Sequence, residues 1–221
     1  MPQQWNRYSF VANNPLKYVD PTGELLELTG SEEERKAAYE HIKGLVGKEG
    51  AKLLFIREEK GHFYVDYKGK MGQGDKLAGT SELNASIARI IESDKTLEYR
   101  IATNFETKEG RRSTAGYSGA ATVGAEESLT GNTQIFVNPK AASIATSILY
   151  GTFRGAAVSS DGKGLIEYDD TVDAHEFGHA YANMFGNASL KDGTGGKSNP
   201  TAIRFENYVR ERRGLNKRTG H

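Results

Sequence analysis

Cysteine is absent from the 221-residue sequence, which excludes disulfide bonds and thiolate metal ligands. A metal site in this protein must therefore use histidine and carboxylate side chains. The 29 basic and 29 acidic side chains balance, so no bulk charge attracts nucleic acid or an anionic membrane surface. No apolar run approaches the roughly 20 residues of a membrane-spanning helix. We therefore expect neither a nucleic-acid partner nor membrane insertion.

The residues that are present predict an α+β fold. Hydrophobic residues make up 37% of the chain, which is enough for one main domain with a buried core. Apolar side chains at helical spacing predict helices over 31–47, 81–93, 169–185 and 199–214. Strands are predicted over 52–56, 62–67, 97–105 and 134–138. The stretch 106–132, rich in Gly, Ser and Thr, is predicted to be a loop or irregular hairpin, and 141–150 fits either a helix or buried irregular structure.

The most informative pattern is His175-Glu176-Phe177-Gly178-His179, within the helix predicted over 169–185. His175 and His179 are four residues apart, so both imidazoles lie on one helix face and can reach one tetrahedral ion. Glu176 projects beside that ion, where it can accept a proton from a metal-bound water. Gly178 leaves room on the helix surface for close packing. The alternative is a pair of ordinary helix histidines with a glutamate between them by chance.

A catalytic zinc site usually has three protein ligands, so a third is expected from elsewhere in the chain. Asn199 and Pro200 mark the start of a helix, as N-cap and first helical residue. Glu206 lies two turns into that helix among apolar neighbours, which makes it the predicted third ligand of a His-His-Glu zinc site. Two alternatives stay open: Glu206 at the surface paired with Arg210, and Glu211 as the ligand.

Other residues are candidates for supporting roles. Asp173 either orients a histidine ligand or, like Asp169 and Asp170, is a favourable charge at the helix N-terminus. Residues 134–138 are either an edge strand that pairs with an extended substrate or a core strand. The candidate donors to a tetrahedral oxyanion are Tyr181, Tyr208, Arg210 and His221. A solvated helix face is expected for the basic residues near the end, Arg210, Arg212, Arg213, Lys217 and Arg218.

The first 23 residues contain three short motifs: Trp5-Asn6-Arg7-Tyr8, Asn13-Asn14-Pro15 and Val19-Asp20-Pro21-Thr22-Gly23. This segment resembles the junction that closes the Rhs/YD-repeat core of bacterial polymorphic toxins. The resemblance implies that the chain belongs to a longer protein whose repeats form a shell around the toxin segment that follows. Leucine commonly follows the last glycine of self-cleaved junctions in that family, whereas Glu24 follows here. An ordinary β-hairpin at a domain edge is the alternative.

The stretch from Ala202 to Arg210 resembles the C-terminal helix of metallopeptidase toxin domains at the ends of Rhs proteins. That resemblance implies that Glu206 is the metal ligand, with Asn207 and Arg210 beside it. It also places Arg218 and His221 as candidates for the rim of the site. A domain of this kind would be secreted from a bacterium and delivered into a target cell, and it would have a cognate immunity protein.

The sequence therefore predicts a zincin-like, gluzincin-type metalloendopeptidase with a small mixed sheet. Zn2+ would be held by His175, His179 and Glu206, and Glu176 would assist the attack of zinc-bound water on peptide bonds of target-cell proteins. The predicted divisions are the junction at 1–23, an accessory helix and hairpin at 24–75, and the catalytic domain at 76–221. Two other functions remain open: a non-proteolytic zinc hydrolase such as an amidase or deaminating enzyme, and an inert fragment of the Rhs shell.

Overall fold

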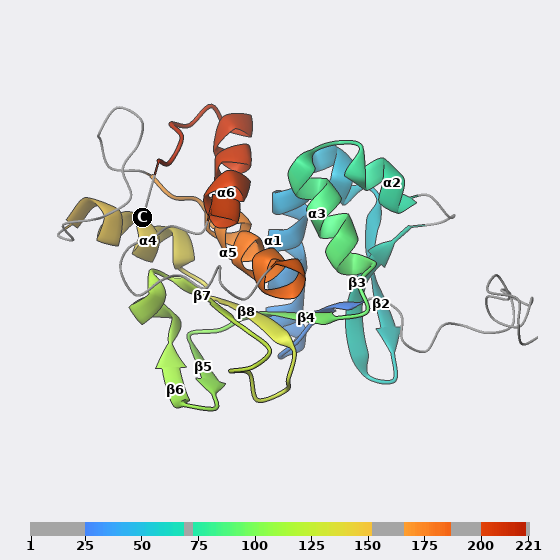
Figure 1. Ribbon diagram of the computed structural model, residues 1–221, viewed down its shortest axis with the longest axis horizontal. Helices are drawn as coiled ribbons and strands as arrows, with labels where there is room; N and C mark the ends of the chain where they lie inside the picture. The colour runs from blue at the N-terminus through green and yellow to red at the C-terminus, as the bar shows by residue number, and fades with distance from the viewer. Residues whose placement is uncertain (1–24, 69–72, 152–165, 187–199, 220–221) are drawn as a thin grey trace, which may run out of the picture.

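The computed structural model describes residues 25–68, 73–151, 166–186 and 200–219. The junction-like motifs between Trp5 and Gly23, the helix cap predicted at Asn199, and His221 lie outside the described residues. Within the described ranges the chain forms a mixed α+β structure, with six α-helices and a mixed sheet (Figure 1). This confirms the predicted class.

Strands and helices are interspersed up to β8, and three helices follow it. The strands are β1 (Leu25–Leu28), β2 (Leu54–Glu59), β3 (His62–Tyr67), β4 (Thr96–Ile101), β5 (Asn104–Thr107), β6 (Gly110–Ser113), β7 (Ala120–Val123) and β8 (Thr133–Val137). The helices are α1 (Glu32–Ala51), α2 (Gln73–Ala78), α3 (Glu82–Ile91), α4 (Ala141–Gly151), α5 (Asp169–Phe185) and α6 (Pro200–Arg212), with a 3₁₀ turn, η3, at Thr114–Tyr117.

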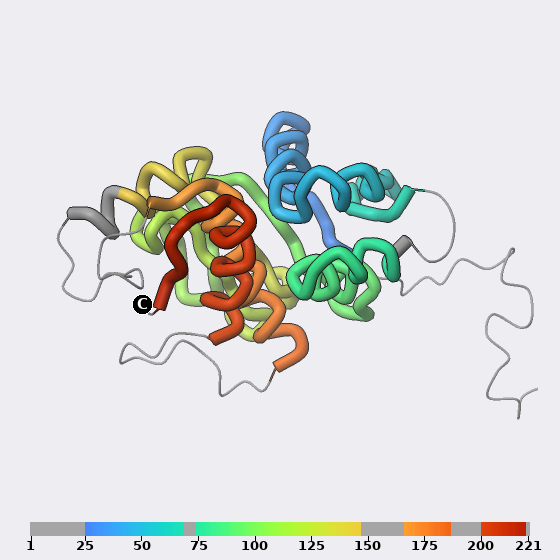
Figure 2. The backbone as a smooth tube through the Cα atoms, turned by 90° about the horizontal axis from the view of Figure 1, so that it is seen from above, coloured from blue at the N-terminus to red at the C-terminus, as the bar shows by residue number. Residues whose placement is uncertain are grey.

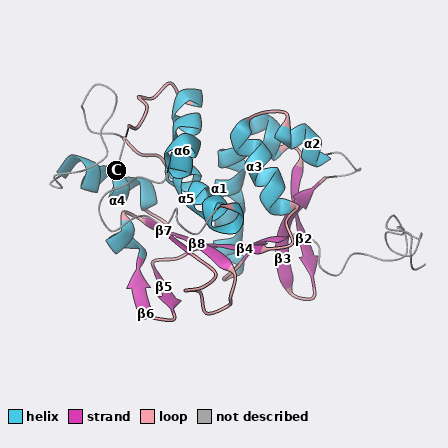
Figure 3. Cartoon of the chain, in the orientation of Figure 1, coloured by secondary structure: helices cyan, strands magenta, loops and turns pink. Residues whose placement is uncertain are grey.

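Six strands form one sheet in the order β2-β3-β1-β4-β8-β7 (Figure 3). The three central strands β1, β4 and β8 are parallel, with Leu26 opposite Leu97 and Tyr99 opposite Ile135. The outer strands β2, β3 and β7 run antiparallel to their neighbours. The sheet therefore contains strands from both of the predicted divisions, 24–75 and 76–221. At one end of it, β7 is an antiparallel edge strand.

Local sequence signals explain several of these elements. Ser31 and Glu34 form the predicted capping box, in which each side chain accepts a hydrogen bond from the other residue's backbone N–H. The backbone of Gly47 is non-helical, with φ of 75° and ψ of 175°, so the first helical segment of α1 ends there as predicted and a second segment continues beyond the kink to Ala51. Lys60 and Gly61 both have positive φ, 52° and 83°, which gives the tight turn that joins twisted antiparallel strands.

The two faces of the sheet are covered differently. Helices lie on one face, and the β5–β6 hairpin lies on the other (Figure 1). On the helix side, Leu26, Leu97 and Ile135 point into the main core with apolar residues of α1, α3 and α5. On the other side a small cluster contains Ala102, Phe105, Ala121, Val123 and Phe136. Because side chains alternate along a strand, Thr122 of β7 faces α5 while its neighbours face the small cluster.

One sequence prediction about strands was wrong, and one open alternative is decided. Residues 97–105 divide into β4 and β5, which belong to different sheets. Of the two readings of residues 134–138, an edge strand or a core strand, the core strand is confirmed: β8 lies between β4 and β7 and is buried along its length. The edge strand next to β8 is β7, within the glycine-rich stretch predicted as loop or irregular hairpin. In the part of the chain that the structure describes, no helix is long and apolar enough to cross a bilayer.

The helices α5 and α6 run side by side, as the view from above shows (Figure 2). Their contact depends on Gly178, where an added Cβ would lie 2.4 Å from the Cα of Ala202 and 2.8 Å from its backbone nitrogen. Such distances leave no space for a methyl group unless the backbone of α6 moves. Gly178, between Glu176 and His179, thus allows α6 to approach the pentad, which confirms the close packing predicted for this position.

Gly178→Ala is therefore expected to lower the free energy of unfolding by about 1–3 kcal/mol, because it overpacks a backbone contact. Urea unfolding followed by circular dichroism measures this change. Gly44→Ala is the matched control, since Gly44 is also helical and its added Cβ would meet only Asp170 at 4.0 Å. That control should be neutral or stabilising. Equal stability of the two variants would contradict the close contact.

Candidate metal centre

The two histidines of the pentad face each other on one turn of α5. The Nε2 atoms of His175 and His179 are 3.0 Å apart, and the ring centroids are 4.7 Å apart with an interplanar angle of 72°. The side chain of His175 is 9% exposed. The spacing of four residues brings the rings together as predicted, with their Nε2 atoms in contact.

This pair fits one metal ion. Two nitrogen ligands at about 2.0–2.1 Å from a tetrahedral ion are separated by about 3.3 Å, which is close to the observed 3.0 Å. The described residues contain no group of three or more His, Cys, Asp or Glu side chains arranged to hold a metal ion. The predicted set of His175, His179 and Glu206 therefore does not surround one point in this geometry.

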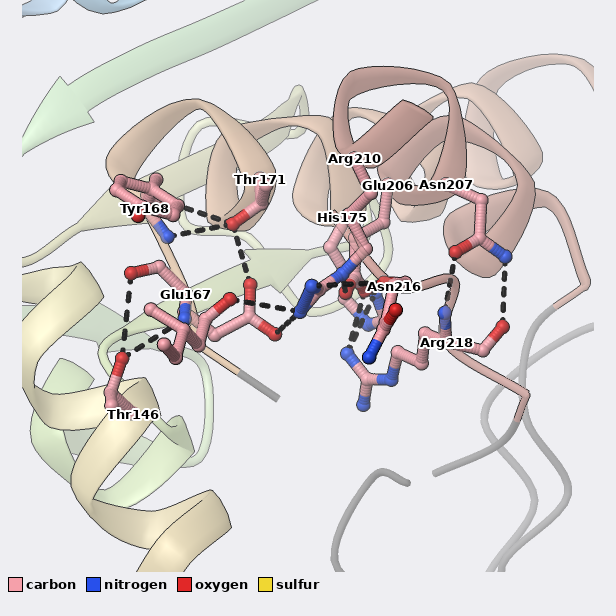
Figure 4. Close-up of polar contacts among 11 residues, drawn as sticks. Thr146, Glu167, Tyr168, Thr171, His175, Glu206, Asn207, Arg210, Asn216 and Arg218 are labelled. Carbon is pink, nitrogen blue, oxygen red and sulfur yellow. Dashed lines mark hydrogen bonds and ion pairs between the residues drawn. The ribbon is translucent and has the colours of Figure 1, made fainter. Parts of the chain in front are cut away.

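Glu206 is fully buried on α6, but it lies at the other edge of the His175 ring (Figure 4). Its Oε2 is 2.9 Å from Nδ1 of His175 and 2.7 Å from Nη1 of Arg218. Its Oε1 accepts a hydrogen bond of 2.8 Å from Nε of Arg210. The carboxylate is thus bound by three donors from three parts of the chain.

Arg210 is the centre of a buried ionic cluster. Its side chain is 1% exposed and lies between two carboxylates, those of Glu206 and Glu167, with Nη2 at 2.8 Å from Oε1 of Glu167. Glu167 also accepts a hydrogen bond of 2.5 Å from the hydroxyl of Thr171. The prediction that Arg210 lies on a solvated helix face was therefore wrong, because its guanidinium group is buried between two carboxylates whose charges it balances.

Burial and charge shift the pKa values in this cluster. Burial lowers the pKa of His175 to about 3, so the ring is neutral at physiological pH. Burial and the negative charge of Glu206 raise the pKa of Glu167 to about 7. Burial alone would also raise the pKa of Glu206, but the hydrogen bond from His175 and the charge of Arg218 hold it well below its usual range. Glu206 is therefore ionised.

Arg218 reaches the cluster because Asn207 fixes the chain segment after α6. The Asn207 amide donates to the carbonyl of Arg218 at 2.8 Å and accepts from its backbone N–H at 2.6 Å. This reciprocal pair directs the guanidinium of Arg218 towards Glu206 (Figure 4). The side chain of Arg218 is only 11% exposed, so the prediction of a solvated helix face was wrong for this arginine as well.

Glu176 lies beside the histidine pair and contacts the sheet edge. Its Oε2 accepts a hydrogen bond of 2.7 Å from the hydroxyl of Thr122 on β7. Glu176 is buried, with 8% exposure. The role of Thr122 was not predicted, because a single threonine in the sequence Ala-Ala-Thr-Val carries no signal of its partner. The pentad helix and the edge of the sheet therefore meet at the buried carboxylate of Glu176.

Comparison with protein-family models, curated proteins and solved structures finds no match to this chain. The case for a function depends on the geometry of this site and on the sequence motifs.

The remaining candidates take other partners. The hydroxyl of Tyr181 accepts a hydrogen bond of 2.7 Å from Arg89, and Tyr208 is 39% exposed. Asp173 is 1% exposed and accepts from the hydroxyl of Tyr99 at 2.6 Å, while Nδ1 of His41 lies 2.9 Å from its other oxygen. The carboxylate of Asp173 thus joins α5 to α1 and β4 and contacts neither histidine of the pentad through these bonds.

The other acidic and basic candidates lie around the periphery. Asp170 binds Arg213 at 2.8 Å and Arg212 at 3.4 Å, which connects the start of α5 to the end of α6. Glu211, the alternative ligand, has a side chain that is 69% exposed and pairs with Lys217 at 3.1 Å. The Glu211–Lys217 pair is a surface contact of small energetic value, whereas the side chain of Asp170 is 9% exposed.

Proposed function

We propose that this chain is a zinc-dependent endopeptidase in which His175 and His179 hold the metal and Glu176 is the general base. One observation carries the proposal: the Nε2 atoms converge at 3.0 Å on a helix whose intervening glutamate is buried against the edge of a sheet. A mixed sheet with an antiparallel edge strand beside the pentad helix is consistent with the predicted zincin-like architecture.

When bound, zinc would polarise the scissile carbonyl and lower the pKa of a water molecule towards about 7. Glu176 would take the proton as water attacks the carbonyl and deliver it to the leaving amine. Thr122 donates to Oε2 of Glu176 and so fixes the orientation of this carboxylate. Among the described strands β7 pairs only with β8, so we propose that its outer edge, next to Glu176, offers backbone groups with which an extended peptide can pair.

The biological setting we propose follows from the motifs at Trp5–Tyr8, Asn13–Pro15 and Val19–Gly23. The chain would be the C-terminal toxin of an Rhs-type protein, released from the shell of the parent chain and countered by an immunity protein. Its substrates would be proteins of a target cell. A non-proteolytic zinc hydrolase would share the same ligands, because metal ligands do not encode a substrate. A structural fragment of the shell would need neither metal nor base.

Metal analysis combined with lysate proteolysis tests this proposal. Purified wild-type protein is expected to bind about one zinc ion per chain, and His179→Ala is expected to lose it because one imidazole cannot hold the ion alone. His62→Ala is the matched control, since that histidine is 57% exposed and pairs with Glu27 on the sheet. A zinc-replete His179→Ala variant would contradict the site.

The same proteins are then incubated with a bacterial lysate, and new peptide termini are identified by mass spectrometry. New termini should arise with the wild type and with His62→Ala, and they should be absent with His179→Ala. Zinc binding without new termini would favour a non-proteolytic zinc hydrolase. Neither zinc nor cleavage in the wild type would favour the structural fragment.

A further inference from the structure

We propose that Glu206 is a positioning residue that orients His175 through Nδ1, rather than the third ligand of the metal. This inference depends on the proposed metal site at His175 and His179. It also differs from the sequence prediction, in which Glu206 binds the ion directly. In the positioning role, the carboxylate of Glu206 fixes the imidazole of His175 and does not contact the ion. In the ligand role, its negative charge would contact the ion.

The carboxylate of Glu206 lies at the Nδ1 edge of the His175 ring. An imidazole presents Nδ1 and Nε2 at different edges, and the Nε2 of His175 is directed at His179. Glu206 Oε2 lies 2.9 Å from Nδ1, so it occupies the edge that faces away from the ion. Two guanidinium groups donate to the same carboxylate, so Glu206 acts as an acceptor and Nδ1 is the donor. Nε2 is then the ring nitrogen that can bind a metal, which is how outer carboxylates fix histidine ligands.

Two arginines, Arg210 and Arg218, form a clamp that holds Glu206 in this place. Arg210 binds Oε1 at 2.8 Å and Arg218 binds Oε2 at 2.7 Å, and the side chain of Glu206 is 1% exposed. With Glu167, these groups form a cluster of two carboxylates and two guanidinium groups whose charges balance. Moving Glu206 to the Nε2 edge would break its contact with Arg218. It would also weaken the pairing of Arg210, which is 1% exposed and has little water to replace the carboxylate.

Asn207 holds one member of this clamp, Arg218, in position. Asn207, the next residue on α6, holds the backbone of Arg218 by two hydrogen bonds of 2.8 and 2.6 Å. Arg218 Nη1 lies 3.4 Å from Nδ1 of His175, because both atoms donate to the same oxygen of Glu206. The segment after α6 therefore serves to keep the carboxylate on Nδ1. A direct ligand would need no such arrangement on this edge of the ring.

Cobalt substitution distinguishes the two roles, because the visible absorption of Co2+ reports the identity and geometry of its ligands. Glu206→Gln keeps an amide oxygen that can accept from Nδ1. If Glu206 positions His175, this variant should bind Zn2+ about 10–100-fold more weakly than the wild type, while its Co2+ spectrum keeps the same band positions and intensity. If Glu206 is a ligand, the Co2+ spectrum of Glu206→Gln will change, and the inference is overturned.

The matched control is Glu211→Gln, on the same helix but 69% exposed, which should leave zinc affinity and the Co2+ spectrum unchanged. Should Glu206→Gln fail to fold, a crystal structure of the zinc-loaded wild type decides. Glu206 on Nδ1 of His175 supports the inference, and a Glu206 oxygen within about 2.2 Å of the ion overturns it. Wild-type protein that binds neither Zn2+ nor Co2+ overturns the proposed metal site and this inference together, whereas an altered spectrum overturns only the inference.

Discussion

Glu176→Gln is expected to lower peptide cleavage by about 10²–10⁴-fold while the fold and the zinc content stay unchanged. The amide has nearly the shape of the carboxylate and can still accept the hydrogen bond from Thr122, which donates to Oε2 at 2.7 Å. It has no charge, however, and cannot accept the proton of the attacking water. The loss should therefore be in kcat, with little change in KM, because binding of the peptide does not require the base.

Three measurements on one preparation define the result: zinc content by elemental analysis, circular dichroism, and the rate at which new termini form in the lysate. Glu33→Gln, on the exposed side of α1, is the control for a neutralised carboxylate. Full cleavage by Glu176→Gln with one zinc ion bound would rule out the proposed mechanism. Loss of zinc in this variant would instead mean that Glu176 belongs to the ligand set.

The local parts of this site could be predicted from the sequence because they depend on residues close together in the chain. The spacing of His175 and His179 defines one helix face, and Ser31 with Glu34 defines a helix start. Both follow from helix geometry alone, and the structure confirms both. The hairpin turn at Lys60 and Gly61 is local in the same sense, since its positive φ values are a property of the two turn residues.

The parts that could not be predicted depend on contacts between distant segments. The edge strand β7 has four residues in a glycine-rich stretch, so its pattern is too short to show alternation. The burial of Arg210 depends on Glu167, which is 43 residues away, and no periodicity reports such a pair. The position of Glu206 on the helix was read correctly, but which edge of the His175 ring it contacts depends on Arg218 and on the path of the chain after α6.

Arg210→Met is expected to lower the free energy of unfolding by about 3–5 kcal/mol, the largest stability effect of any substitution considered for this chain. Methionine fills similar space but leaves Glu206 and Glu167 buried without the cation between them. Arg204→Met is the control, because Arg204 lies on the same helix and its pair with Glu82, 55% and 51% exposed, should contribute at most about 1 kcal/mol. Urea unfolding at constant pH measures both losses.

The loss in Arg210→Met should also depend on pH. The pKa of Glu167 in the folded protein, about 7, is above its unfolded value, so the folded state binds more protons and wild-type stability from this group falls as pH rises from about 4.5 to 7. Without Arg210 that pKa rises further, and the fall continues to higher pH. The difference between Arg210→Met and the wild type should therefore be smaller at pH 5 than at pH 8.

A second substitution separates charge repulsion from lost packing. Glu167→Gln in the Arg210→Met background removes one of the two facing carboxylates, so it should restore part of the lost stability at pH 8 and little at pH 5, where Glu167 is already protonated. A loss in Arg210→Met that is independent of pH and unaffected by Glu167→Gln would mean that the packing of the arginine stem, rather than the ionic cluster, stabilises this side of the proposed metal site.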